Sequence, residues 1–402
     1  MAVLAELMKA TIWPYLIAQL PTAYGLSLTR LNTHSLQGLP VPSGQDVQKP
    51  RLYFLFMVDD NLPNLQIWQN FFRSAVQHTD YEALLHCENR TRCLQNHPNL
   101  QHNFTLIETV QSQWCADLVT PMNALLAAAI RGSANRGNVQ DKFIFVSGNS
   151  VPVKSFAYVQ KKLLIDDGPT SNFCVGHWPD WAWYKGKYVL AKHSQWMVLS
   201  RAHAEKSLVV QKEISPEYLQ SQMTSLRFGG MEWLSPFLWS LRERVIEITH
   251  SPVLDSLLSL VVPPVSGCND EFWHLAAVVG ALDRKQAATE EISLPSLTNG
   301  NLTMKDEVSN QFQGVCDTYF VIDGKDESDL AKKLTATEKF GGTGVFLRPH
   351  IHAGKFSTLS EQSLSALRDS PYLFARKIDN TTTYVGPLSL PEAFDALIFS
   401  QK

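Results

Sequence analysis

The sequence predicts an α/β protein with a Rossmann-type, mostly parallel central sheet flanked by helices. Three observations predict this fold class: apolar runs of strand length, apolar residues at helical spacing between those runs, and polar turns that follow them. Strands and helices that alternate in this way are typical of parallel sheets, because a parallel pair needs a crossover connection. With 402 residues, of which 45% are hydrophobic and 18% charged, the chain can build a large core, which excludes global disorder.

The first predicted strand is RLYFLFMV at residues 51–58, a continuous apolar run that suits a strand buried on both faces. It follows residues 39–50, whose proline, glycine and polar residues predict a linker. A helix is predicted next, because Pro63 suits a helix start and apolar residues then recur at helical spacing. These apolar residues are Leu65, Trp68, Phe71, Phe72 and Val76.

The alternation continues with three further segments. A second strand leads into a polar turn at residues 81–89, a helix covers residues 120–133, and another buried strand with its turn covers residues 141–153. Ligands of such folds bind beyond the carboxyl ends of the strands. The turns at residues 58–61, 86–89 and 147–152 are therefore the predicted location of a site.

Charge and motif content exclude several classes of function. The net charge of -3 and the lack of a basic run argue against nucleic-acid binding. The six cysteines form no C-x-x-C pair, which argues against structural zinc, and Cys87 and Cys93 either bridge a short loop or remain buried thiols. Neither G-x-G-x-x-G nor a P-loop occurs, and the strand-end turns contain no Asp-x-Asp.

Residues 1–49 are expected to form an N-terminal segment and linker, and residues 50–402 one domain. Residues 10–29 carry no charge, but Pro14 and Pro21 weaken them as a membrane span. The segment is either a weak signal anchor or a helix lying on the domain. Four N-x-[ST] sequons mildly favour a secretory route: Asn89, Asn103, Asn301 and Asn380.

Two stretches have both a structural and a chemical interpretation. In GCNDEFWHLAAVVGAL, residues 267–282, the acids Asp270 and Glu271 either cap a helix or supply a general base beside aromatic walls. Residues 171–208 concentrate aromatic side chains that either pack in a core or stack on sugars. These aromatic residues are Trp178, Trp181, Trp183, Tyr184 and Trp196.

Several motifs together resemble one enzyme family. KHSQW at residues 192–196 is similar to the K-x-S-Q-W segment of the core-2/I-branching β-1,6-N-acetylglucosaminyltransferases, glycosyltransferase family 14. Residues 51–72 resemble the first strand and helix of its plant-type branch, and residues 143–156 its L-S-G-x-x-x-P-L strand end. NDEFW at residues 269–273 and YLFARKID at residues 372–379 also match family segments, in the expected order.

The resemblance implies a GT-A-like fold and an inverting transferase that needs no metal or other cofactor. The donor would be a UDP-sugar carrying GlcNAc, xylose or glucuronate, and the acceptor a hydroxyl of a glycan or glycoprotein. It also implies a Golgi or secretory-pathway membrane protein that faces the lumen. The chain has NLTMKDE at residues 301–307 where the plant-type branch often has T-Y-V-D-W, which leaves the donor sugar and the acceptor open.

The resemblance assigns Glu271 as the catalytic base, with Asp270 orienting it beside the sugars. Lys377 matches a lysine that contacts the diphosphate, Arg376 lies beside it, and Arg348 is a further candidate cation. Position at the strand ends makes four residues candidates for nucleotide binding: Val58, Asp59, His86 and Glu88. The candidates for donor or acceptor sugar are Ser147, Gly148, Asn149, Gln195 and Trp196, the last two on the acceptor wall.

Two other classes of protein remain possible from the sequence. One is a non-catalytic carbohydrate- or nucleotide-sugar-binding protein that keeps the fold, which the departure at residues 301–307 favours. The other is a glycoside hydrolase with two carboxylates, for example Glu271 and Asp180. The alternating strands and helices of the N-terminal half argue against the hydrolase.

Overall fold

The computed structural model describes residues 49–112, 117–133, 137–184, 187–213, 273–278, 296–298, 301–303, 312–313, 316–320 and 354–400. All of them belong to the unit Val47–Lys402. The N-terminal segment, Asp270, Glu271 and Arg348 lie outside the described residues. Within the described helices, none is long and apolar enough to cross a membrane.

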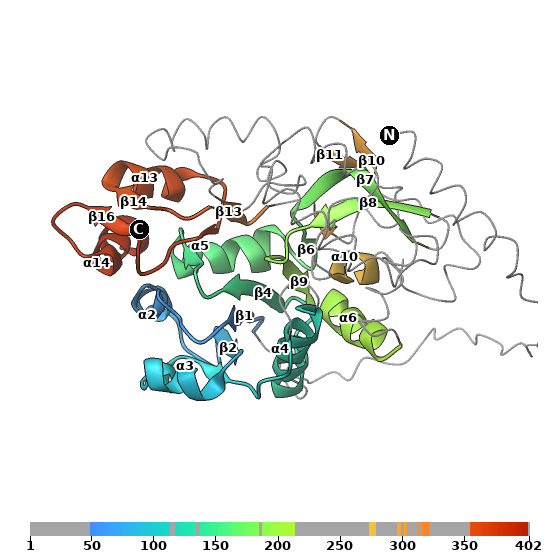
Figure 1. Cartoon of the computed structure of the whole chain (residues 1–402), viewed down its shortest axis with the longest axis horizontal. Helices are drawn as coiled ribbons and strands as arrows, with labels where there is room; N and C mark the ends of the chain where they lie inside the picture. Colours follow the sequence, from blue (N-terminus) through green and yellow to red (C-terminus); the bar gives the residue numbers. More distant parts are fainter. Residues whose placement is uncertain are drawn as a thin grey trace, which may run out of the picture. The chain divides into compact units, whose positions relative to one another are not determined.

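A seven-stranded sheet with the order β12-β6-β9-β4-β1-β2-β3 holds the described N-terminal half together (Figure 1). Its strands are β1 (Leu52–Val58), β2 (Tyr81–Cys87), β3 (Thr105–Leu106), β4 (Lys142–Ser147), β6 (Ser171–Asn172), β9 (Val198–Ser200) and β12 (Phe312–Gln313). Strand β1 is parallel to β2 and β4, whereas β9 is antiparallel to β4 and β6. The predicted α/β class with a mostly parallel sheet is confirmed.

The apolar run of β1 is buried because helices cover both faces of the sheet. On one face, α2 (Leu65–Phe72) packs Trp68 and Phe71 edge-on against Phe54. On the other face, Leu125 of α4 (Val119–Gly132) belongs to the same core cluster as Tyr53. Two further helices, α6 (Arg201–Glu213) and α10 (Trp273–Val278), add Ala204 and Leu275 to that second cluster.

One predicted boundary, the end of the first helix, differs from the structure. Helix α2 ends at Phe72, so Val76 lies beyond the helix and is 61% exposed. A turn there lets the chain enter β2, and this tertiary requirement outweighs the apolar spacing. Within the strand and turn predicted at residues 141–153, the structure has β4, a turn after Ser147, and the short strand β5 (Val151–Pro152).

A second, three-stranded sheet has the order β13-β15-β5, with β13 at Thr318–Phe320 and β15 at Phe374–Arg376. Strand β5 is antiparallel to β15, with Ala375 opposite Val151. This pairing joins the segment that ends at Arg376 to the turn that follows β4. Around it lie β14 (Thr358–Ser360), β16 (Thr383–Val385), α5 (Phe156–Lys161), η3 (Lys162–Asp166), α13 (Glu361–Asp369), α14 (Leu390–Phe394) and η9 (Asp395–Phe399).

The remaining described elements are short or form hairpins. Strands β7 (Val175–Tyr184) and β8 (Lys187–His193) pair antiparallel, as do β10 (Ser296–Thr298) and β11 (Asn301–Thr303). Helix α3 (Arg90–Asn96) and the turn η2 (Leu100–His102) connect β2 to β3. Disulfides join Cys87 to Cys93, the bridged alternative from the sequence, and Cys174 to Cys316.

Candidate active site

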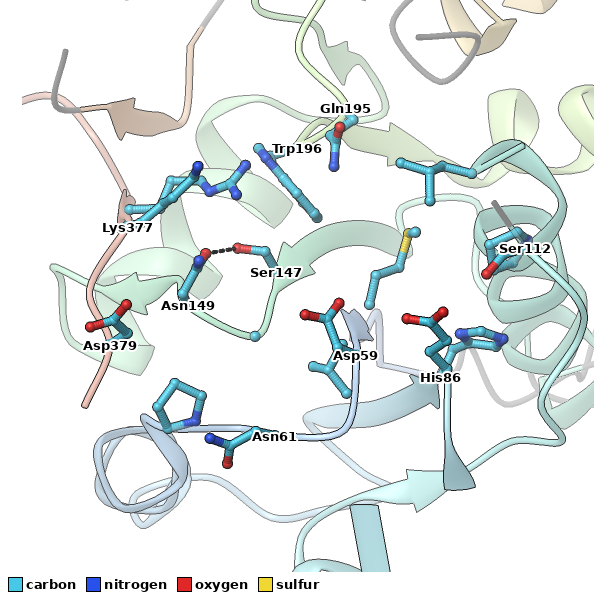
Figure 2. A pocket seen from close by; sticks show the side chains of 18 of the residues that line it. Asp59, Asn61, His86, Ser112, Ser147, Asn149, Gln195, Trp196, Lys377 and Asp379 are labelled. Carbon is cyan, nitrogen blue, oxygen red and sulfur yellow. Dashed lines mark hydrogen bonds between the residues drawn. The ribbon is translucent and has the colours of Figure 1, made fainter. Parts of the chain in front are cut away.

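A cavity of about 460 Å³ opens at the carboxyl ends of β1, β2 and β4 (Figure 2). The structure brings together eleven of the residues predicted from sequence: Val58, Asp59, His86, Glu88, Ser147, Gly148, Asn149, Gln195, Trp196, Arg376 and Lys377. It adds residues that were not among the individual candidates, among them Asn61 and Asp379 from predicted segments, and Pro63, Ser112 and Asn380. The roles assigned to these residues stay predictions, but their convergence on one cavity is a finding.

One end of the cavity carries the carboxylates of Asp59 and Glu88, and we call it the acid end. Asp59 follows β1 and Glu88 follows β2, so the parallel pairing places the two turns side by side. Backbone hydrogen bonds join them: Glu88 N–H donates to Val58 O at 3.0 Å, and Asn89 N–H donates to Asp59 O at 3.2 Å. Both side chains are exposed, and they offer hydrogen-bond acceptors to a ligand.

His86 lies at the same end but is only 3% exposed. Val110 N–H donates to His86 Nε2 at 3.1 Å, and burial lowers the pKa of the imidazole below its usual value. The ring is therefore neutral at pH 7 and accepts a hydrogen bond that fixes the segment after β3. Ser112, two residues after Val110, thereby reaches the cavity. No periodic pattern marks that segment, so sequence reasoning had no signal that could point to Ser112.

The turn after β4 forms the floor of the cavity. Gly148 is required there, because a Cβ atom would lie 2.9 Å from Val58 Cγ1 and 3.0 Å from Asn61 O. Ser147 Oγ donates to Asn149 Oδ1 at 2.8 Å, the dashed contact in Figure 2. The turn is thus held close to the end of β1, while the side chain of Asn149 faces the cavity.

The other end carries Arg376 and Lys377, and we call it the cation end. Arg376 is the last residue of β15 and Lys377 follows it. Figure 2 shows Lys377 and Asn149 on the opposite side of the cavity from Asp59 and His86. Ile378 N–H donates to Asn149 O at 2.9 Å, and the buried Asn64 amide donates to Ile378 O at 2.7 Å. These bonds fix the backbone beside Lys377 against two elements of the N-terminal half.

Trp196 was predicted to form an acceptor wall; it lines the cavity, and that role stays a prediction. The side chain is 6% exposed and belongs to the core cluster that contains Phe145 and Met197. Its ring lies under the Arg376 guanidinium, with Cζ 4.5 Å from the ring centroid. Trp178, Trp181, Trp183 and Asp180 lie on β7, whose side chains are outside the described part of the structure.

Glu271 and Asp270 lie outside the described residues, but the helix that follows them is described. Helix α10 begins at Trp273, and Leu275 N–H lies 3.4 Å from His193 Nε2. His274 Nε2 contacts Asn123 Oδ1 at 3.3 Å. The described residues contain no group of three or more His, Cys, Asp or Glu that could hold a metal ion, and the expectation of metal independence stays a prediction.

The strand order and the polar cavity define an α/β protein with a mostly parallel sheet and a cavity at the carboxyl ends of its strands. The chain is similar to Glycosyltransferase BC10 of Oryza sativa subsp. japonica, with 28% identity over 194 residues. The alignment covers 44% of this chain and 44% of the relative, so it spans less than half of the relative's length. No protein-family profile matches the chain.

Two solved structures show a low level of similarity. One is a 4-diphosphocytidyl-2C-methyl-D-erythritol synthase, with a TM-score of 0.27, 9% identity, and coverage of 44% of this chain and 85% of that chain. The other is a Bacillus anthracis protein assigned as a glucose-1-phosphate thymidylyltransferase, with a TM-score of 0.24, 8% identity, and coverage of 39% and 74%. Scores this low carry no weight, and the fold class follows from the observed strand order.

Proposed function

We propose that the protein is an inverting, metal-independent glycosyltransferase that moves a sugar from a UDP-sugar to a hydroxyl of a glycan or glycoprotein. The observation that carries this proposal is a cavity at the ends of parallel strands, with the Asp59 and Glu88 carboxylates at one end and Arg376 and Lys377 at the other, where the Asp379 carboxylate is paired with Lys355. The relationship to a plant glycosyltransferase supports the reaction class.

The proposed orientation follows from charge. Uridine occupies the acid end, where Glu88 and Asp59 accept hydrogen bonds from the ribose hydroxyls or the uracil N–H. The diphosphate then lies at the cation end, beside Arg376 and Lys377. Cations that are already in place stabilise the charge that develops on the departing diphosphate, and charge-assisted hydrogen bonds are the strongest that side chains offer.

Inversion needs a base on the acceptor side of the sugar. We assign this role to Glu271, which would take the proton of the acceptor hydroxyl as it attacks the anomeric carbon. General-base catalysis of this kind contributes about 10²–10⁴-fold. Asp270 would orient the base, Ser147, Gly148 and Asn149 would line the donor sugar, and Gln195 would face the acceptor. Arg348 remains a further candidate cation.

The first experiment is UDP binding by calorimetry, followed by transfer assays with a panel of UDP-sugars. Glu271→Gln should bind UDP like the wild type and lose about 10²–10⁴-fold in turnover. Glu361→Gln, which changes an exposed acid in the first turn of α13, is the matched control. Full activity in a folded Glu271→Gln variant would contradict the assigned base. Loss of activity in EDTA that manganese restores would contradict metal independence.

A second candidate is a non-catalytic nucleotide-sugar- or carbohydrate-binding protein. The NLTMKDE segment favours it, and part of that segment forms β11 of a short hairpin. Binding of UDP without transfer of any sugar in the panel would select this candidate. Binding of a glycan without binding of UDP would exclude the transferase.

We also propose a secretory-pathway location, in the Golgi and facing the lumen. Two disulfides support it, Cys87–Cys93 and Cys174–Cys316, because disulfides persist in oxidising compartments. Attachment to a membrane through the N-terminal segment is part of the same proposal. Fractionation of cells that express the full chain tests both statements, and recovery in the cytosol would contradict them.

A further inference from the structure

The contact between Arg376 and Trp196 joins two parts of the molecule that are distant in sequence. Arg376 ends β15 in the three-stranded sheet, and Trp196 precedes β9 in the seven-stranded sheet. The guanidinium Cζ lies 4.5 Å from the centroid of the indole ring, within the range of about 6 Å for a cation–π interaction. Both residues line the cavity.

The indole ring is held firmly in place. Trp196 is 6% exposed within a core cluster, and its backbone N–H donates to Ser194 Oγ at 3.3 Å. Ser194 N–H in turn donates to Cys174 O at 2.8 Å, and Cys174 is bridged to Cys316. The ring is therefore a fixed surface, while the arginine above it has a long side chain with several rotatable bonds.

We propose that Trp196 is a positioning residue that holds the Arg376 guanidinium toward the diphosphate of the donor. This inference rests on the proposed function, and it assigns Trp196 to the donor rather than to the acceptor wall. A long side chain that is already oriented loses less conformational freedom when it binds an anion. An indole ring provides the best cation–π surface among the aromatic side chains.

The proposal predicts which ligands should respond to a change at Trp196. Trp196→Leu keeps an apolar side chain but removes the aromatic face. UDP and inorganic pyrophosphate should then bind about 5- to 30-fold more weakly, the range that one cation–π contact supplies. Uridine, which has no phosphate, should bind as to the wild type. Trp196→Phe retains an aromatic face and should recover most of the UDP affinity.

A double-mutant cycle with Arg376→Met makes the test specific. In the Arg376→Met background, Trp196→Leu should cause no further loss of UDP affinity, because the cation that the ring holds is gone. Trp196→Met serves as the second apolar variant if Trp196→Leu does not fold. Additive losses in the cycle, equal losses for uridine and UDP, or an unchanged UDP affinity would each overturn the proposal.

The measurements also separate this inference from the proposed function. If the wild-type chain does not bind UDP, the proposed function fails, and the same cycle read with pyrophosphate still tests the role of Trp196. If the wild type binds UDP and Trp196→Leu weakens only the binding of a glycan acceptor, the inference fails. The prediction that Trp196 forms part of the acceptor wall is then correct. In that case the proposed function stands.

Discussion

The charged side chains at the amino ends of the central strands are largely buried and paired, whereas the carboxylates at the carboxyl ends are exposed. At the amino ends of β1 and β4, the Asp141 carboxylate binds both the Arg201 guanidinium and the Arg51 backbone N–H. Arg201 Nη2 lies 2.7 Å from Asp141 Oδ2, and Arg51 N–H donates to Asp141 Oδ1 at 2.9 Å. The Asp141 side chain is 0% exposed. At the carboxyl ends, the Asp59 and Glu88 carboxylates form no hydrogen bond or ion pair with another described residue.

This difference distinguishes charges that support the fold from charges that are available to a ligand. A buried ion that loses its partner is costly, because the remaining charge is left without compensation. An exposed carboxylate on a cavity wall costs little to keep or to remove. Variants at the amino ends of the central strands should therefore lower the free energy of unfolding. Variants at the carboxyl ends should instead lower the affinity for a ligand.

The largest effect is expected at the amino ends. Asp141→Ala removes the buried partner of Arg201, which keeps its ion pair with the exposed Glu205. It also removes the acceptor for Arg51 N–H and Asn138 N–H. We expect a loss of about 3–5 kcal/mol in the free energy of unfolding, measured by urea denaturation. Asp59→Ala is the control from the carboxyl end, with an expected change within about 0.5 kcal/mol. Similar losses in the two variants would remove the distinction between the ends.

The next largest effect concerns ligand binding at the cation end. Lys377→Met should weaken UDP binding by about 10- to 100-fold, the value of one or two charge-assisted hydrogen bonds, with little change in stability. Lys161→Met removes an exposed lysine on α5 and should leave UDP affinity unchanged. Calorimetry on both variants provides the comparison. Equal affinity of Lys377→Met and wild type would place the diphosphate elsewhere.

A smaller effect should appear in the pH dependence of stability. Asp317 is buried and accepts from Asn172 Nδ2 at 3.0 Å, and burial raises the pKa of its carboxyl from 3.8 to about 7. The folded state therefore holds a proton that the unfolded state releases, so this contribution to stability is full below pH 3.8. It is lost as the pH rises through about 7.

Asp317→Asn should flatten the decline in unfolding free energy between about pH 4 and 7, because the amide does not titrate. Burial lowers the pKa of the nearby Lys142 from 10.5 to about 8, so this lysine stays protonated across that interval and does not produce the slope. Denaturation at a series of pH values measures the difference. Identical slopes for the variant and the wild type would contradict the assignment.

The smallest effect is expected for an exposed ion pair. Arg73 lies 2.7 Å from Asp395, with side chains 63% and 28% exposed. Solvent screens this pair, so Arg73→Met should change the unfolding free energy by less than about 1 kcal/mol. If Arg73→Met lowered the unfolding free energy as much as Asp141→Ala does, burial would not explain why the Arg201–Asp141 pair contributes more than the Arg73–Asp395 pair.

The sequence was sufficient for the elements whose signal is local. The apolar run of β1 and the apolar spacing of α2 predicted those elements, and the turns after β1, β2 and β4 correctly indicated the cavity. Strand β15 has only three residues, and its neighbours come from distant segments, so no local pattern predicts it. Resemblance to a family, rather than periodicity, drew attention to Arg376 and Lys377.

Contacts over long sequence separations account for what the sequence analysis missed. Asn61 and Ser112 reach the cavity through loops, and the ring of Trp196 contacts an arginine on another sheet. The prediction that the first helix continues to Val76 was wrong, because the chain must turn there to enter β2. Such features depend on how elements pack, which one-dimensional patterns do not record.

The bond between Asn64 and the carbonyl of Ile378 spans 314 positions in the chain. While the protein is being synthesised, the carboxylates after β1 and β2 emerge from the ribosome long before Arg376 and Lys377. A nascent chain can therefore fold its first strands early, but the cavity lacks its cation end until the chain has been translated beyond β15. Any ligand that needs both ends of the cavity would then bind only after that point in synthesis.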